Sequence, residues 1–204
     1  MEPGKKHWEN IYRTKGPADL SWTQAQPAIS LDFIHSFHLP RTARIIDIGG
    51  GDSRLVDCLL DEGYTDLTVL DISGAALRKT QQRLGHRAHQ VKWIEQDITL
   101  FHPTETYDLW HDRATFHFLT TSPQVSNYLS TARGALPSGG YFVIGTFSDN
   151  GPEKCSGLPI HQYSEQELTE ALTNGFSKIK CITEDHHTPF NTLQNFLFCS
   201  FKRA

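Results

Sequence analysis

The stretch Arg44-Ile45-Ile46-Asp47-Ile48-Gly49-Gly50-Gly51-Asp52-Ser53 decides the fold of this chain. It is a short apolar run that ends in three glycines. The apolar residues that follow, over 55–60, have helical spacing up to Gly63. The pattern therefore predicts a strand, a tight loop and a helix. In an open sheet of parallel strands, such a loop lies at the edge where ligands bind.

The same alternation of strand and helix continues along the chain. Ser73 is placed to cap the helix after the second strand, and Ser164 with Glu167 forms a capping box for a helix up to about residue 174. Further strands are expected at 67–71, 91–95, 107–111 and 141–145, a helix over about 123–136, and a terminal β-hairpin from 176–183 and 195–202. These elements predict a doubly wound α/β fold. Its seven-stranded sheet is mostly parallel, with helices on both faces and an antiparallel C-terminal hairpin.

The length predicts one domain with a short appendage. At roughly 150 residues per domain, the 204 residues of this chain exceed one domain by about a third. Residues 1–40 form the expected N-terminal lid, with Trp8 and Tyr12 on one face of a short helix and a second helix over 29–37. Residues 41–204 form the expected main domain.

The amino-acid composition indicates which classes of partner and which cellular compartment to expect. Hydrophobic residues make up 38% and charged residues 21%, which suits a folded chain, and 19 Lys+Arg against 23 Asp+Glu give a net charge of −4. That balance disfavours nucleic acid as a partner, and no apolar run suits a membrane span or a secretion signal. The four cysteines and 11 histidines follow no metal-ligand spacing, so we expect reduced thiols, no metal and a cytoplasmic protein.

An acidic residue after the second strand indicates an adenosyl ligand. Asp71 lies about 20 residues after Gly51, the offset at which a carboxylate reaches ribose hydroxyls. A dinucleotide-dependent oxidoreductase is a competing interpretation. Its G-x-G-x-x-G frame, counted from Gly49, requires a small residue where Arg54 stands, which disfavours that class.

These motifs together resemble the class I S-adenosylmethionine-dependent methyltransferases. The resemblance covers about residues 40–204. Its motifs are the acidic residue and glycine loop of 47–53, the ribose-binding acid Asp71, the adenine-side Asp97-Ile98, and Leu136-Pro137-Ser138-Gly139-Gly140-Tyr141 before the fifth strand. The opening His7-Trp8-Glu9-Asn10-Ile11-Tyr12 with Ser21-Trp22 is also similar to small bacterial members. Ser53 replaces the third glycine of the family loop.

The resemblance implies a cofactor, S-adenosyl-L-methionine, and a product, S-adenosyl-L-homocysteine. It implies that backbone groups of Gly49 and Gly51 hold the methionine part of the cofactor, with Asp47 supporting the loop or the ammonium group. It also implies that Asp71 binds both ribose hydroxyls. The resemblance further implies that Asp97 and the Ile98 N–H form hydrogen bonds with the adenine. The side chains of Ile72 and Ile98 would pack on the two faces of the base.

The acceptor side depends on residues with competing interpretations. His111 is the candidate general base or cofactor contact, although a hydrogen-bonded core histidine is equally compatible with its position. Arg113 and His117 follow at the strand end where this fold faces its substrate. Cys155 lies in a long loop and is either an acceptor contact or a small buried residue. Two aromatic residues, Tyr12 and Trp22, are expected to close over the sulfonium or the acceptor.

The predicted function is methyl transfer to a small-molecule acceptor. We expect no added domain that would bind a macromolecule, and the acidic balance argues against RNA or DNA. A protein lysine methyltransferase is the close alternative, because small members that modify proteins share the aromatic start. A non-catalytic adenosyl-ligand-binding protein is an alternative of a different class. The acceptor atom, whether N, O, S or a metalloid, stays open.

Overall fold

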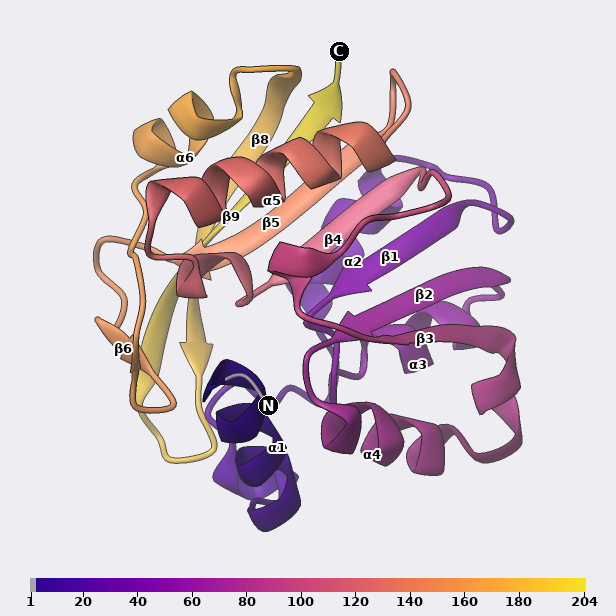
Figure 1. Ribbon diagram of the computed structural model, residues 1–204, viewed down its shortest axis with the longest axis vertical. Coiled ribbons are helices and arrows are strands. Elements are labelled where there is room, and N and C mark those ends of the chain that lie inside the picture. The colour runs from indigo at the N-terminus through magenta and orange to yellow at the C-terminus, as the bar shows by residue number, and fades with distance from the viewer. Residues whose placement is uncertain (1–2) are drawn as a thin grey trace.

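A seven-stranded sheet with the order β3-β2-β1-β4-β5-β9-β8 forms the centre of the computed structural model, which describes residues 3–204 (Figure 1). The first five strands pair in parallel, and β9 pairs antiparallel with both β5 and β8. The fold class predicted from the sequence is confirmed. The strands are β1 (Arg44–Ile48), β2 (Asp66–Asp71), β3 (Val91–Glu95), β4 (Leu109–Arg113), β5 (Tyr141–Phe147), β8 (Phe176–His187) and β9 (Leu193–Arg203).

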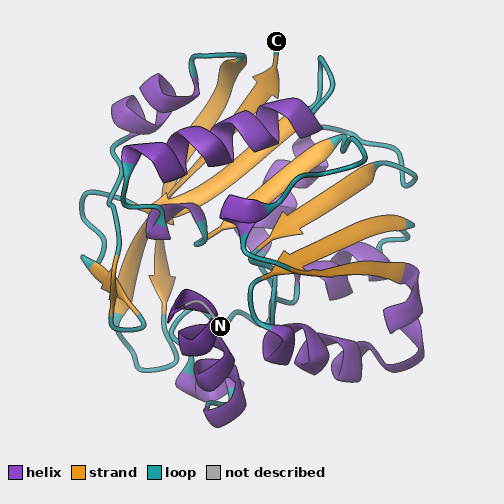
Figure 2. Cartoon of the chain, in the orientation of Figure 1, coloured by secondary structure: helices purple, strands orange, loops and turns teal. Residues whose placement is uncertain are grey.

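Helices cover both faces of this sheet (Figure 2). Alternate strand residues point to opposite faces, so Ile45 and Ile46 enter different cores. On the Ile45 face pack α2 (Ala28–Ser36), α3 (Leu55–Asp61) and α4 (Gly74–Leu84); on the Ile46 face pack α5 (Ser122–Ala135) and α6 (Glu165–Leu172). Short 3₁₀ turns η1 (Pro17–Asp19), η2 (Gly85–Gln90), η3 (Ile98–Leu100) and η4 (Phe116–Phe118), and a small hairpin of β6 (Lys154–Cys155) and β7 (Leu158–Pro159), complete the chain.

The N-terminal helix α1 (Pro3–Thr14) lies beyond the carboxyl ends of the parallel strands, next to α4 (Figure 1). Ile11 and Tyr12 of α1 pack with Leu20 against Ala75 and Ala76 of α4. Helix α2 instead lies under the sheet, where Ile34 is fully buried. The two N-terminal helices therefore contact different parts of the domain.

The fourth strand begins two residues later than predicted. The sequence predicts a strand over 107–111, whereas β4 spans Leu109–Arg113. The N–H of Tyr107 bonds to the carbonyl of Ala135 at the end of α5 instead of to a neighbouring strand. The shift makes His111 the middle residue of β4, opposite Asp47 of β1.

The terminal hairpin is longer than predicted. Strands β8 and β9 extend to His187 and back from Leu193, so that only 188–192 connects them. Cross-strand hydrogen bonds hold this polar extension, although its sequence lacks the apolar alternation that marks a strand.

Two of the four cysteines form a disulfide bond, which corrects the prediction of reduced thiols. Cys181 and Cys199 lie directly opposite each other on β8 and β9, with their Cα atoms 4.1 Å apart. Opposed positions on antiparallel strands bring side chains into contact. The strand register creates this pair, and the separation of 18 residues in the sequence does not reveal it. Cys58 and Cys155 are free thiols.

Candidate functional site

A cavity of about 360 Å³ lies at the carboxyl edge of the sheet. Residues at or just after the ends of β1, β2, β3, β4 and β5 line it, and Trp8, Tyr12 and Trp22 join them from the N-terminal segment. A second hollow of about 450 Å³ adjoins it and shares Tyr12, Trp22, Gly49 and Arg113. The cavity brings together these residues proposed from the sequence: Tyr12, Trp22, Gly49, Asp71, Ile72, Asp97, Ile98, Arg113 and Cys155.

The glycine loop after β1 packs too tightly for side chains. Gly49 has φ of +66°, and a Cβ atom there would lie 1.7 Å from the Thr115 hydroxyl oxygen. A Cβ atom on Gly51 would lie 2.5 Å from Oδ2 of Asp71. Because glycine has no side chain, the loop backbone can lie directly against Asp71 at the end of β2. This close approach fits the cradle that an adenosyl ligand with a methionine tail requires.

Asp71 supplies a buried acceptor at the end of β2. Its side chain is 6% exposed, and its Oδ1 accepts the N–H of Ser73 at 2.7 Å. Burial raises the pKa of this carboxyl group to about 7, against the lowering effect of backbone N–H groups at Ser73 and Gly51; the charges of Asp47 and Glu9 raise it further. A carboxylate in this position can accept hydrogen bonds from neighbouring hydroxyls.

The cavity ends in an apolar slot after β2 and β3. Ile72, Asp97, Ile98 and Thr99 line it. Oδ1 of Asp97 accepts the N–H of Thr99 at 2.8 Å and its hydroxyl at 2.7 Å, which fixes the carboxylate at the start of η3. A flat base between two isoleucines, beside a carboxylate, would have the contacts that adenine needs.

His111 belongs to a buried hydrogen-bond chain. Nδ1 of His111 lies 2.7 Å from Oδ1 of Asp47, and Nε2 lies 2.9 Å from the Ser30 hydroxyl. Both ring nitrogens have partners, and the residue is 2% exposed. His111 and Asp47 line the adjoining hollow instead of the main cavity. These contacts favour the second interpretation of His111 given above, that of a hydrogen-bonded core histidine.

Arg113 projects between the two hollows at the end of β4. Its Nη1 donates to the carbonyl of Trp22 at 3.0 Å, whereas Nε and Nη2 are buried without a partner. The guanidinium carbon lies 5.1 Å from the centre of the Phe196 ring. Burial lowers the pKa of Arg113 to about 10, and the charge of Glu184 opposes that shift.

His117 and Cys155 keep their neutral forms. His117 is completely buried and lies outside the cavity wall; its Nδ1 accepts the N–H of Phe147 at 3.3 Å. Burial lowers the pKa of His117 to about 3, and Arg113 adds to that effect. Cys155 lines the cavity, and burial raises the pKa of its thiol to about 12. Neither group is a base or a thiolate at neutral pH.

Aromatic rings from the N-terminal segment roof the cavity. The Trp8 ring lies 5.9 Å from Trp22 and 5.2 Å from Phe118, and Tyr12 lies 6.3 Å from Trp22. All four line the cavity. Such ring faces suit a cation and exclude water.

Glu9, which the sequence reasoning did not select, fastens this roof. It is 6% exposed, and its Oε1 accepts the N–H of Ala75 at 2.9 Å and the Ser73 hydroxyl at 3.4 Å. Burial opposes ionisation, but the Ala75 N–H and the charges of Arg13 and Arg78 outweigh it and lower the pKa of Glu9. In the sequence, Glu9 and Arg13 have only the spacing of a helical surface pair.

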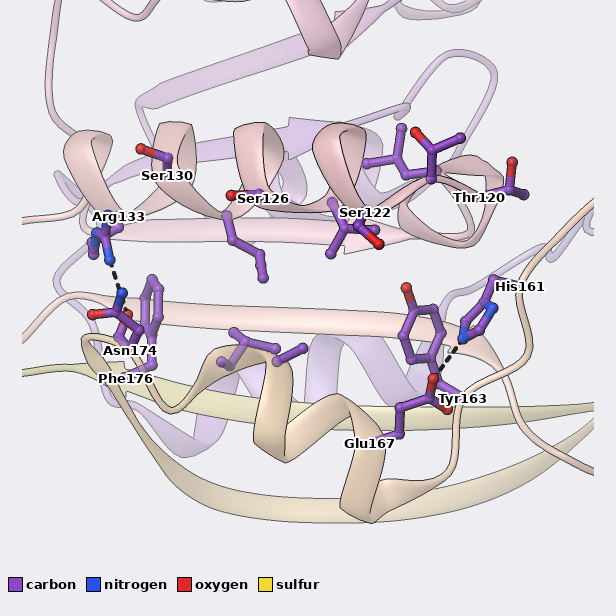
Figure 3. A pocket seen from close by; sticks show the side chains of 16 residues that line it. Thr120, Ser122, Ser126, Ser130, Arg133, His161, Tyr163, Glu167, Asn174 and Phe176 are labelled. Atoms are coloured by element: carbon purple, nitrogen blue, oxygen red, sulfur yellow. Dashed lines mark hydrogen bonds and ion pairs between the residues drawn. The ribbon is translucent and has the colours of Figure 1, made fainter.

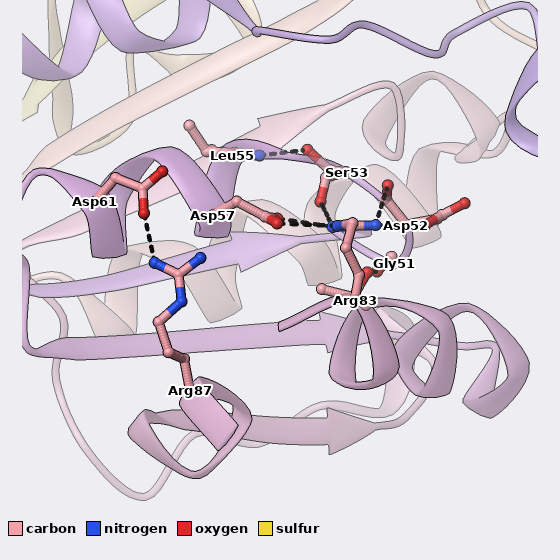
Figure 4. Close-up of polar contacts among 9 residues, drawn as sticks. Gly51, Asp52, Ser53, Leu55, Asp57, Asp61, Arg83 and Arg87 are labelled. Carbon is pink, nitrogen blue, oxygen red and sulfur yellow. Dashed lines mark hydrogen bonds and ion pairs between the residues drawn. The ribbon is translucent and has the colours of Figure 1, made fainter. Parts of the chain in front are cut away.

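Arg83 of α4 holds the glycine loop from behind, and sequence reasoning also missed it (Figure 4). Its guanidinium donates to Asp52 Oδ1 at 2.7 Å, to the Ser53 carbonyl at 2.6 Å and to both carboxylate oxygens of Asp57 at 2.8–3.0 Å. A planar fork that bonds several acceptors at once fixes the loop relative to α4. Only the fold brings these positions together.

A further groove of about 480 Å³ lies between α5 and α6, away from the glycine loop (Figure 3). His161 Nε2 lies 2.7 Å from Glu167 Oε1 at one end, and Arg133 contacts the Asn174 carbonyl at the other. Over residues 3–204, no group of three or more His, Cys, Asp or Glu side chains is placed to hold a metal ion. Within the same range, every helix is too short or too polar to cross a membrane.

The chain is similar to known methyltransferases. Residues 46–142 match the family model described as a methyltransferase domain. The chain is 25% identical over 144 residues to mouse eEF1A lysine and N-terminal methyltransferase, with 67% of this chain and 20% of that protein aligned. It is 34% identical over 140 residues to malonyl-[acyl-carrier protein] O-methyltransferase of Anoxybacillus flavithermus, with 68% of this chain and 51% of that protein aligned. It thus spans about a fifth of the first relative and half of the second.

Solved structures share the fold over the whole chain. N-methyltransferase NodS from Bradyrhizobium japonicum, in complex with S-adenosyl-L-homocysteine, superposes with a TM-score of 0.77 at 18% identity. The superposition covers 99% of this chain and 99% of that one. The N-terminal segment and the terminal hairpin are therefore parts of the shared architecture.

Proposed function

Because the chain belongs to the class I S-adenosylmethionine-dependent methyltransferases, we propose that it transfers the methyl group of this cofactor to a small-molecule acceptor. The aromatic roof is the observation that carries the choice of acceptor. Trp8, Tyr12 and Trp22 cover the cavity that Asp71 and Asp97 line. The cavity of about 360 Å³ has the size of a site for a cofactor or another small molecule.

Residues on the β2 and β3 side would hold the cofactor. The backbone at Gly49 and Gly51 would receive its methionine part, and Asp71 would accept from the ribose hydroxyls. The two isoleucines and Asp97 described above would hold the adenine. When bound, S-adenosylmethionine supplies a methyl group on a positively charged sulfur.

Residues on the β4, β5 and β9 side would hold the acceptor. Displacement at a methyl carbon needs alignment of the nucleophile and removal of water more than it needs a proton acceptor. Phe118, Phe147 and Phe196 supply apolar walls, and Trp8 and Trp22 close the roof. These side chains exclude water and restrict the approach of the acceptor.

The test separates acceptors by size. The pure protein is incubated with methyl-labelled S-adenosylmethionine and a cell extract, and the small-molecule and protein fractions are then counted. We expect label in the small-molecule fraction with the wild type and a strong loss of label with Asp71→Ala, matched by Asp61→Ala as a surface control. Label confined to the protein fraction would overturn the small-molecule proposal.

Protein lysine methylation is the second candidate. The curated relatives named eEF1A lysine and N-terminal methyltransferase favour it. It requires an opening through which a lysine side chain reaches the cavity. It predicts label on a protein band that survives denaturation, and Trp22→Ala, which removes one ring of the aromatic roof, should then leave that label largely intact.

A further inference from the structure

We propose that Arg113 selects a methyl acceptor that carries a carboxylate group. The proposal rests on the proposed function, because it names the chemical class of the acceptor at the same site.

Arg113 has unused hydrogen-bonding capacity inside the protein. A guanidinium carries five N–H donors in a planar fork, and here only Nη1 has a partner, the Trp22 carbonyl at 3.0 Å. Nε and Nη2 are shut off from solvent and unpaired, and Oε2 of Glu184 is likewise buried without a hydrogen-bond partner. None of the ion pairs among residues 3–204 includes Arg113. Buried polar groups nearly always have partners, and a two-oxygen anion is the partner that fits this fork.

The guanidinium points to the acceptor side of the cavity. It lies over the ring of Phe196 in β9, and Glu184 of β8 is the carboxylate whose charge acts on it most strongly. In the sheet order, β9 and β8 lie on the opposite side of β4 from β2, which carries Asp71. The cation therefore faces away from the strands that would hold the ribose and adenine.

A second unpaired polar atom lies on the same side. Gln194 lines the cavity from the start of β9; its Nε2 donates to the Ser21 hydroxyl at 3.2 Å, and its Oε1 is buried without a partner. Gln194 Oε1 is an acceptor, so it would take a donor group of the same ligand, next to the carboxylate on Arg113.

The acceptor side lacks a group that could remove a proton at neutral pH. Of the ionisable side chains that line the cavity, Asp71 and Asp97 lie on the cofactor side. Besides Arg113, the described residues leave Tyr12 and Cys155, and burial raises the pKa of both, that of Cys155 to about 12. A carboxylate acceptor is already ionised near neutral pH. It therefore suits a site that binds an anion and supplies no base.

An anion bound to Arg113 would have one of two sources, the acceptor or the carboxylate of the cofactor itself. The experiment therefore measures both by titration calorimetry. First, S-adenosylhomocysteine is titrated into the wild type, Arg113→Met and Arg113→Lys. Then phenylacetate and its uncharged analogue phenylacetamide are titrated into each loaded protein. Arg87→Met is the charge-matched control, because Arg87 pairs with Asp61 at the surface (Figure 4).

We expect the loaded wild type to bind phenylacetate at least about tenfold more tightly than phenylacetamide. Arg113→Met should abolish that preference and leave the affinity for S-adenosylhomocysteine within about threefold. Arg113→Lys keeps the charge without the fork, so it should fold and keep part of the preference. Arg87→Met should behave as the wild type.

Three results overturn the proposal. The first is equal affinity of the loaded wild type for the two probes, and the second is no saturable binding of phenylacetate. The third is a loss of S-adenosylhomocysteine affinity of about tenfold or more in Arg113→Met with the probe preference unchanged, which would assign the arginine to the cofactor. A wild type that fails to bind S-adenosylhomocysteine would instead overturn the proposed function.

Discussion

Ionisation of Asp71 should control the affinity for S-adenosylhomocysteine between pH 6 and pH 8. Burial raises the pKa of this carboxyl group to about 7 in the free protein. In the proposed complex, ribose hydroxyls would donate to the ionised form, so binding would first remove the proton. With a pKa of about 7, roughly one carboxyl in eleven is ionised at pH 6 and about ten in eleven at pH 8. The affinity should therefore rise about tenfold over this range, or about 1.4 kcal/mol.

Folding stability should respond to the same group in the opposite direction. The pKa in the folded protein lies above the ordinary value of 3.8, so the contribution of Asp71 to stability is fully present below pH 3.8. That contribution is lost as the pH rises through about 7. The free protein thus becomes less stable over the pH range in which it binds the ligand more tightly.

Titration calorimetry with S-adenosylhomocysteine at pH 6, 7 and 8 tests this coupling, and Asp71→Asn is the matched variant. The amide has the shape of the carboxyl group but cannot ionise. The variant should bind about as tightly as the wild type at pH 6 and about tenfold more weakly at pH 8. A pH-independent affinity in the wild type, or the same pH dependence in Asp71→Asn, would refute the reasoning.

Three further changes test the structure around the cavity. Gly51→Ala places a Cβ atom 2.5 Å from Asp71 Oδ2, so calorimetry should show a loss of S-adenosylhomocysteine affinity of about tenfold or more. Tyr128→Phe removes the hydroxyl that donates to the buried Asp112 at 2.6 Å; urea unfolding should show a loss of about 2 kcal/mol. Cys155 is buried and the pKa of its thiol is about 12, so mass spectrometry should find it unmodified by iodoacetamide in the native protein at pH 8.

Each change has a control or a contradicting result. Gly63→Ala also alters a glycine with positive φ, but a Cβ atom there has nothing within 4 Å, so it should leave ligand affinity unchanged. Unchanged stability in Tyr128→Phe would mean that the carboxylate finds another donor. Rapid alkylation of Cys155 would show that the thiol is more acidic and more open than the structure indicates.

The sheet could be predicted from the sequence because its strands have local signals. The runs at 44–48 and 91–95 are apolar segments bounded by loops, and both strands have these bounds. The start of β4 was wrong because Tyr107 favours a strand by composition, while its N–H bonds to the end of α5. The strand propensity of a residue does not tell which neighbouring element will form hydrogen bonds with its backbone N–H and C=O groups.

The candidate site could be predicted most directly where a residue follows from a strand end. Asp71, Asp97 and Arg113 line one cavity because the ends of parallel strands meet at one edge. The Cys181–Cys199 bond depends on the register of two strands, and the partners of Glu9 lie 64 and 66 residues away in the sequence. Contacts of this kind follow from the fold and have no local signal.

The attachment of Glu9 to the start of α4 has a consequence for turnover. To lift α1 off the cavity, the protein must withdraw a carboxylate from the Ala75 N–H and the Ser73 hydroxyl, which leaves the Ala75 N–H in the first turn of α4 without its acceptor. If S-adenosylhomocysteine leaves by this route, we expect its departure to depend on loosening the start of a helix that begins three residues after Asp71. Methyl transfer should be faster than release of S-adenosylhomocysteine. Rapid-quench kinetics should therefore show a burst of methylated product in the first turnover. Glu9→Gln weakens the contact of α1 with Ala75 and Ser73, so it should reduce the amplitude of that burst and raise the steady-state rate of methylation.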